Sequence, residues 1–337
     1  MRKPPAPWRN GRYIKATIGQ VVRAQDDQTL SPPGWADVRR HLLPSPGERR
    51  RRARHGLPYL AVVALVLNEG RDLREWIEFH VLQGVERFYV YDDGSTDNTN
   101  EVLEPYIERG VAELTRWADS GNQIEAIGDA FSRHGDDVRW LAALDPDEFL
   151  FCPTGERVVD VLVDFESYPA VAVHWNMFGT SNIERRAPND EVLPIFTRRS
   201  DDFGPQSANR HVKSIVDPWC TVDPVPTDPH ARPYSVGFAV NESGLPVAGP
   251  RNWPIQCDRL RINHYWTKSK ADSLRKVARQ FPLRGYSPRF NPRRMEQLLD
   301  PSLNAVEDRT ILDVLDRLRG DAAAGPPNPV PAHAAHT

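Results

Sequence analysis

Hydrophobic positions in the first half of the chain form short continuous runs, which alternate with longer stretches at helical spacing. The runs have the composition of strands covered on both faces, and the stretches are typical of amphipathic helices. The predicted strands are Tyr59–Leu67, Arg87–Tyr91, Val111–Thr115, 139–151 and Ala170–Trp175. The predicted helices are Leu73–Gln83, Thr99–Arg109, Gln123–Arg133 and Arg157–Phe165. This alternation predicts an α/β fold with an open, mostly parallel sheet, right-handed crossovers and flanking helices.

The pattern loosens after Trp175 into loops rich in Pro, Arg, Asp and Asn. Further strands are predicted at Leu193–Thr197, His211–Val216 and Arg259–Trp266, and helices at Lys270–Gln280 and Arg309–Arg319. We therefore divide the chain into four parts: an N-terminal arm or linker at 1–57, one large domain at 58–283, a helical segment at 284–319 and a disordered tail at 320–337.

Two residues of the first helix have a predicted structural role. Asp72 precedes the helix and is expected to act as its N-cap. His80 lies in the apolar stripe of the same helix, and we interpret it as a packed histidine rather than a ligand.

Polar residues follow three of the predicted strands at the point where each strand ends. These clusters are Asn68-Glu69, Asp92-Asp93 and the pair Asp145/Asp147. In an open parallel sheet the carboxyl ends of the strands line one crevice, where ligands bind. Each cluster alone is weak evidence for a binding site, because acidic turns after strands are common. Their shared location predicts a binding site at this edge.

The segment around Asp145 and Asp147 organises this prediction. An apolar strand ends in two aspartates that are separated only by Pro146, so their carboxylates can converge on one hard cation with oxygen ligands. Read alone, the segment is equally consistent with a surface turn, since Asp and Pro are turn formers.

Composition and charge narrow the class of protein. The chain has 337 residues, 39% of them hydrophobic, and a formal net charge of −3, which gives no global indication of nucleic-acid or membrane binding. An arginine run at 49–52 is interpreted as a solvated linker, because no aromatic residues interleave with it. Three widely spaced cysteines, the absence of an apolar N-terminal run and the lack of a membrane-length apolar window predict a cytoplasmic protein.

The ordered series of motifs resembles a known family. Leu67-Asn68-Glu69, Glu75-Trp76-Ile77-Glu78-Phe79-His80 and Tyr91-Asp92-Asp93-Gly94-Ser95-Thr96-Asp97-Asn98-Thr99 are similar to the nucleotide-binding half of GT-A glycosyltransferases, in particular the family-2-like and family-92-like group. Asp145-Pro146-Asp147-Glu148-Phe149, Trp175-Asn176-Met177-Phe178-Gly179 and His264-Tyr265 before Lys268-Ser269 extend the resemblance. The match runs from about Leu60 to Gln280. It implies a GT-A, Rossmann-like domain over 58–283 with a loop-rich acceptor part.

The resemblance implies a role for each motif. The chain is expected to be a metal-dependent hexosyltransferase of polysaccharide biosynthesis, inverting, that moves a sugar from a nucleotide-sugar donor, favouring UDP, to a glycan, lipid-linked or small-molecule hydroxyl. The expected nucleotide-sugar ligands are Asn68, Glu69, Asp92, Asp93, Asp145 and Lys213. The expected Mn²⁺ or Mg²⁺ ligands are Asp145, Asp147 and His264. The expected acceptor platform is Trp175 and Phe178.

Several points stay open at the level of sequence. An inverting transferase needs a carboxylate general base, and Asp217, Asp223 and Asp228 are weak candidates without a supporting pattern. Lys213 and His264 also read as ordinary strand residues, and Trp175 as a core tryptophan. Two other functions compete: a non-catalytic module that binds sugar nucleotide or glycan, and a nucleotidyltransferase or phosphohydrolase. The single glycine in the loop 68–71 argues against a nucleotidyltransferase.

Overall fold

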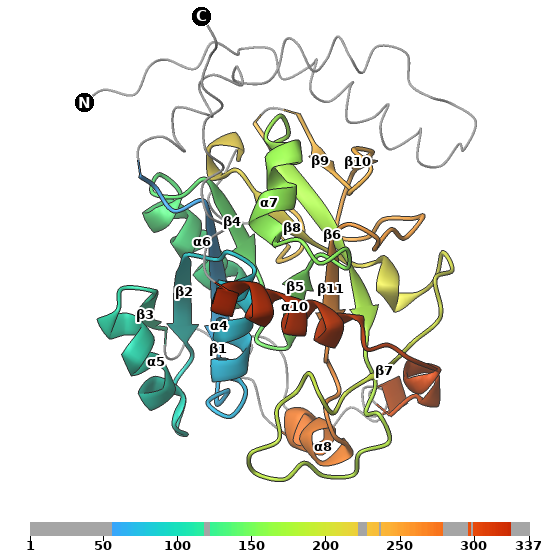
Figure 1. Ribbon diagram of the computed structural model, residues 1–337. Coiled ribbons are helices and arrows are strands. Elements are labelled where there is room, and N and C mark those ends of the chain that lie inside the picture. The colour runs from blue at the N-terminus through green and yellow to red at the C-terminus, as the bar shows by residue number, and fades with distance from the viewer. Residues whose placement is uncertain are drawn as a thin grey trace, which may run out of the picture.

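The computed structural model describes residues 56–117, 122–221, 228–235, 237–278, 296–297 and 299–324. Its central sheet has the strand order β10-β9-β6-β8-β4-β1-β2-β3, and β11 joins β5 to β6 (Figure 1). The strands are β1 Leu60–Val66, β2 Arg87–Asp92, β3 Ala112–Arg116, β4 Trp140–Ala143, β5 Glu148–Phe151, β6 Ala170–Met177, β8 Val212–Val216, β9 Ala239–Val240, β10 Pro246–Val247 and β11 Arg261–His264. The short strands β7 Arg198–Arg199 and β12 Val306–Glu307 pair separately.

Strands β3, β2, β1 and β4 are mutually parallel, and β8 inserts antiparallel between β4 and β6. The α-helices are α4 Leu73–Leu82, α5 Thr99–Glu108, α6 Gln123–His134, α7 Val158–Leu162, α8 Lys270–Ala278 and α10 Thr310–Ala324. The structure thus confirms the expected α/β class, with an open sheet that is parallel in its first half.

Strand β1 shows why its sequence is apolar throughout. Leu60 and Val62 pack into the core beneath α4, α5 and α10, whereas Ala61 and Val63 pack against α6 on the opposite face. Each of these side chains has at most 1% of its surface exposed. A strand with helices on both faces cannot alternate apolar with polar residues, so the run stays continuous.

The register of the parallel strands brings the three polar clusters to one edge. Val66 lies beside Asp92, and Val63 lies beside Ala143. The Asp93 backbone N–H donates to the Val66 carbonyl at 2.9 Å, which extends this pairing into the loops. The residues after β1, β2 and β4 therefore face a common crevice, and α8 lies past this lower edge of the sheet (Figure 1).

The predicted strand Leu193–Thr197 is wrong. Residues 193–195 form a turn, and the neighbouring strand consists only of Arg198–Arg199. Glu75 of α4 explains the turn, because its carboxylate accepts the backbone N–H groups of Val192 at 2.6 Å and Leu193 at 2.9 Å. A side chain therefore satisfies the donors that a sheet ladder would otherwise satisfy.

The last helix extends beyond its predicted end. Helix α10 continues through Gly320 to Ala324, so the predicted tail does not begin at 320, and its Ile311 and Leu315 join the core beside α4. The predicted arm or linker up to residue 55, which includes the arginine run, and residues 325–337 lie outside the described residues. No helix among the described residues has the length and apolar content needed to cross a bilayer.

His80 is a packed histidine, as predicted. Its ring is fully buried, its Nδ1 lies 2.8 Å from the carbonyl of Trp76, and its Nε2 accepts the backbone N–H of Leu150 at 3.1 Å. Burial lowers the pKa of His80 to about 4, so the ring is neutral and serves to join α4 to β5.

Candidate active site

The loops after β1 and β2 are held together by predicted site residues. Asn68 has φ 56°, in the left-handed region that asparagine tolerates well. Its side-chain oxygen accepts the backbone N–H of Thr96 at 2.7 Å and of Asp97 at 3.1 Å. Asp92 accepts a backbone N–H three residues further along at 2.9 Å. Asn68 and Asp92 therefore shape this edge of the crevice, and Asp93 lies beside them.

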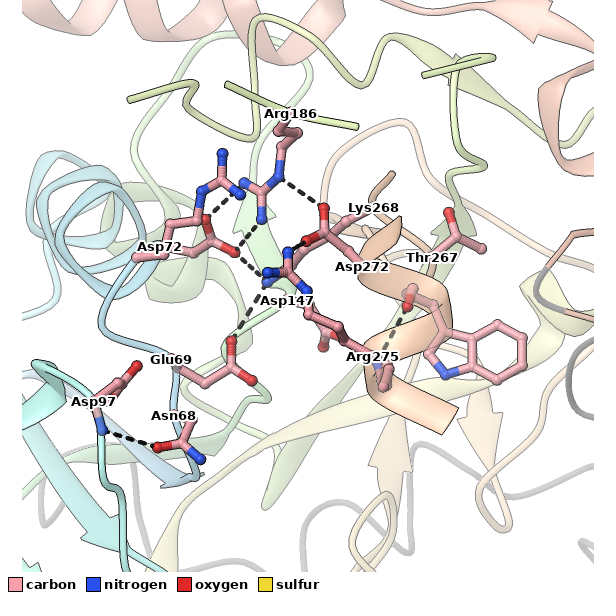
Figure 2. A pocket seen from close by; sticks show the side chains of 13 residues that line it. Asn68, Glu69, Asp72, Asp97, Asp147, Arg186, Thr267, Lys268, Asp272 and Arg275 are labelled. Carbon is pink, nitrogen blue, oxygen red and sulfur yellow. Dashed lines mark hydrogen bonds and ion pairs between the residues drawn. The ribbon is translucent and has the colours of Figure 1, made fainter. Parts of the chain in front are cut away.

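A pocket of about 280 Å³ opens between the loop after β1 and helix α8 (Figure 2). Side chains of both charges line it. The carboxylates are Glu69, Asp72, Asp97, Asp147 and Asp272, and the cations are Arg71, Arg186, Lys268, Arg275 and Lys276. A wall with this many cations beside carboxylates suits a ligand that carries both phosphate and hydroxyl groups.

Asp72 occupies the N-cap position of α4, as predicted, but its side chain joins the two sides of this pocket. Its side chain makes no capping hydrogen bond; instead it accepts from Arg186 at 2.7 and 3.1 Å and from Lys268 at 2.5 Å. Burial acts to raise the pKa of Asp72, but Lys268 and Arg186 outweigh it and lower the value to about 2. Lys268 also approaches Glu69 at 3.4 Å, so this lysine connects two acidic residues of the first loop.

Asp145 is turned toward β8. Its carboxylate pairs with the Lys213 ammonium at 3.1 Å and also accepts a hydrogen bond from Gln123. Lys213 is buried and contacts Glu148 at 3.4 Å as well. Burial raises the pKa of Glu148 well above its ordinary value, which Lys213 opposes. The predicted ligand Lys213 is thus the counter-ion of two carboxylates at the end of β4.

Asp147 points in a different direction, into the pocket. Its carboxylate lies 2.6 Å from the Lys276 ammonium and 3.4 Å from His264 Nε2. Burial acts to raise the pKa of Asp147, yet Lys276 and then His264 hold it well below the ordinary value. The carboxylate is therefore ionised at neutral pH and faces two potential partners, one nitrogen base and one ammonium.

The expected three-residue metal shell is only partly assembled. Asp147 and His264 converge, but Asp145 does not join them, and the described residues contain no group of three or more His, Cys, Asp or Glu side chains placed to hold a metal. His264 Nδ1 is buried without a hydrogen-bond partner among the described residues. A carboxylate and an imidazole fit a divalent cation that takes its remaining ligands from phosphate oxygens.

The aromatic residues predicted as an acceptor platform separate into two roles. Phe178 is fully buried and packs 4.7 Å from the Tyr265 ring, so it is a core residue and offers no surface to an acceptor. Trp175 has 9% of its surface exposed, and its ring centroid lies 4.3 Å from that of His264. Only Trp175 borders the site.

Two of the three weak general-base candidates lie in different parts of the structure. Asp217 follows β8, which runs antiparallel to β4, so it lies at the opposite edge of the sheet from Asp145. It is buried and paired with Arg139 at 3.1 Å, which makes it a structural residue and corrects the prediction. Asp228 lies near the crevice, where it accepts the backbone N–H of His230 at 2.7 Å. Asp223 lies outside the described residues.

The structure also reveals site residues that the sequence did not indicate. Arg186, in a loop rich in polar residues, and Lys276, two turns into α8, reach the pocket from more than a hundred positions away from their partners. The sequence contained one indication of a role for Lys276, which is its position in the helix that follows His264-Tyr265. A helix that directly follows a strand at this edge of the sheet begins near the crevice.

The chain resembles a known family over the segment that carries these loops. The sequence model of glycosyltransferase family 92 matches residues 68–219, which include the loops after β1, β2 and β4. This segment is similar to glycosyltransferase family 92. A family 92 protein of Oryza sativa subsp. japonica is 30% identical over 181 residues, which are 52% of this chain and 29% of that protein. The expected resemblance to glycosyltransferases is thereby confirmed.

Two further proteins resemble smaller shares of this chain. A galactan β-1,4-galactosyltransferase of Arabidopsis thaliana is 33% identical over 106 residues, which are 28% of this chain and 20% of that protein. The crystal structure of S. aureus TarS residues 1–349 aligns over 48% of this chain and 47% of that chain, with 14% identity and a TM-score of 0.32. The chain spans about a third or less of the length of these curated relatives.

Proposed function

We propose that this chain transfers a sugar from a nucleotide-sugar donor, a UDP-sugar, to a hydroxyl group of a glycan. The observation that carries the proposal is the Asp147 carboxylate, which lies 3.4 Å from His264 and lines a pocket of mixed charge, at the edge where the carboxyl ends of β1 and β4 meet. The name of the Arabidopsis relative makes galactose the first sugar and β-1,4-galactan the first acceptor to test.

Asp147 and His264 would hold a divalent cation, Mn²⁺ or Mg²⁺, which would supply positive charge for a diphosphate leaving group. The residues of the chain provide the rest. Lys268 lies in the same pocket, where its ammonium is positioned to pair with phosphate. Glu69 offers a carboxylate to ribose or sugar hydroxyls, and Trp175 offers the edge of its ring to an acceptor.

The first test measures thermal unfolding of the chain with UDP, GDP and CMP, each in Mn²⁺, Mg²⁺ or EDTA. A ligand at about 100 times its dissociation constant stabilises a protein by about 2.7 kcal/mol. We expect a rise in Tm with UDP and Mn²⁺ that disappears in EDTA.

Two variants connect that shift with the proposed residues. Asp147→Ala and His264→Ala should each remove the EDTA-sensitive part of the shift, because each removes one protein ligand of the cation. The matched control is Asp217→Asn, which alters a buried carboxylate at the other edge of the sheet. If Asp147→Ala responds to UDP and Mn²⁺ as wild type does, the metal-bridged site is refuted.

A further inference from the structure

Three histidines surround the ring of Trp175. Ring centroids lie 5.1 Å from Trp175 for His211, 5.0 Å for His230 and 4.3 Å for His264. His264 faces Asp147, as described above. His211 and His230 belong to none of the motifs that carry the family resemblance, and their ring nitrogens show what each can do.

The hydrogen bonds of His230 fix its tautomer. Its Nδ1 lies 3.0 Å from the backbone carbonyl of Val212, and a carbonyl oxygen can only accept, so Nδ1 carries the proton. In the neutral ring the lone pair is then on Nε2. Among the described residues Nδ1 is the ring nitrogen of His230 that makes a hydrogen bond, so Nε2 is the ring atom with a lone pair for a proton from a ligand.

His211 has the same tautomer as His230, but its Nε2 is occupied. Its Nδ1 lies 2.9 Å from the carbonyl of Ala208, which likewise places the lone pair on Nε2. That lone pair already accepts the Nε–H of Arg251 at 2.9 Å. His211 is therefore occupied at both nitrogens, and His264 directs its Nε2 to Asp147.

Surrounding groups hold His230 in place. Asp228 accepts its backbone N–H at 2.7 Å, and the Ser214 hydroxyl donates to its carbonyl at 3.0 Å. Burial and the nearby charge of Lys213 lower the pKa of His230 to about 4, while Asp228 and Asp145 oppose this. The ring is thus neutral at pH 7.

The location of His230 fits the acceptor side of the reaction. The ring of Trp175 contacts both the ring of His230 and the ring of His264, and His264 faces the proposed metal ligand Asp147. An inverting displacement needs its base across the anomeric carbon from the leaving group. We propose that His230 is the general base that activates the acceptor hydroxyl, an inference that rests on the proposed function.

The acceptor oxygen forms a bond to the anomeric carbon while its proton passes to His230 Nε2. The bond from that carbon to the phosphate oxygen breaks, and its electron pair leaves with the nucleoside diphosphate. The resulting imidazolium keeps its Nδ1–H bond to Val212 and returns its proton to water after product release.

The test compares His230→Asn, His230→Ala and His211→Ala with wild type, using UDP-galactose and a β-1,4-galacto-oligosaccharide. Asparagine retains an N–H donor for the Val212 carbonyl and supports folding, but it has no basic nitrogen. We expect kcat to fall by about 10²- to 10⁴-fold in both His230 variants. The Kd for UDP, measured by calorimetry, should change by less than about threefold, because the base contacts the acceptor and not the nucleotide.

Chemical rescue separates a base from a structural residue. Imidazole added to His230→Ala should restore transfer by at least about tenfold, since it can occupy the vacated space and take the proton. His211→Ala should not respond to imidazole. A His230→Asn enzyme with kcat within about threefold of wild type, or a His230→Ala enzyme without rescue, overturns the role of His230. Absence of transfer by wild type instead overturns the proposed function.

Discussion

Removal of the Lys276 ammonium should strengthen metal binding in the absence of nucleotide. Lys276 lies 2.6 Å from Oδ2 of the Asp147 carboxylate, and His264 Nε2 lies 3.4 Å from Oδ1 of the same group. A divalent cation must therefore displace or compete with this ammonium. The substitution Lys276→Met keeps the length of the side chain and removes only the competing charge.

The structure gives the magnitude of this effect. At 2.6 Å and an effective dielectric constant of about 20, the Coulomb attraction of the pair is about 6 kcal/mol. The Lys276 side chain is 26% exposed, so screening and the hydration that the ammonium regains on release leave about 1–2 kcal/mol. Since about 1.4 kcal/mol corresponds to a tenfold change in Kd, the Lys276→Met variant should bind Mn²⁺ roughly 5- to 30-fold more tightly.

Isothermal titration of Mn²⁺ into the nucleotide-free chain at pH 7 measures this directly. Lys270→Met is the matched control: it removes the same charge from the same helix, but Lys270 pairs with the exposed Glu184 at 3.2 Å. Its Mn²⁺ affinity should stay close to that of wild type. Equal or weaker Mn²⁺ binding by Lys276→Met, or the same gain in Lys270→Met, would refute the competition.

Two further predictions concern stability. The pKa of Asp72 is lowered from 3.8 to about 2, so its contribution is complete above pH 3.8 and is lost as the pH falls through 2. The wild-type advantage over Asp72→Asn in urea unfolding should shrink by about 2 kcal/mol over that range. Asp217→Asn leaves the buried Arg139 without its carboxylate and should cost about 3–5 kcal/mol in unfolding free energy, with UDP affinity unchanged.

Each stability prediction has a clear contrary outcome. A stability difference between wild type and Asp72→Asn that does not vary from pH 5 to pH 2 would show that the ion pairs with Arg186 and Lys268 do not set its pKa. A large loss of UDP affinity in folded Asp217→Asn would return this residue to the active site.

The parallel half of the fold was readable because its sequence obeys a single constraint. A strand such as β1, with helices on both faces, must be apolar throughout, and the residue after it must begin a loop. Residues at the carboxyl ends of β1, β2 and β4 then meet by topology alone. For this reason the location of the site near Asn68, Asp92 and Asp145 could be predicted before any side-chain geometry was known.

The remainder of the site depends on contacts that local patterns do not encode. The turn at Val192 and Leu193 reads as a strand because its residues are apolar, and only the distant Glu75 makes it a turn. Asp145 and Asp147 are two residues apart, but one pairs with Lys213 and the other with Lys276. Arg186 and His230 lie in loops without periodicity, so their roles emerge only from their hydrogen-bond partners.

The most direct test of the account is a product assay with wild type and Asp147→Ala. The chain is incubated with UDP-galactose, a β-1,4-galacto-oligosaccharide and Mn²⁺, and the glycan is analysed by mass spectrometry. We predict an oligosaccharide one hexose longer with wild type, and none with Asp147→Ala or in EDTA. Elongation by Asp147→Ala at the wild-type rate would contradict the central claim that this pocket and its carboxylate carry out sugar transfer.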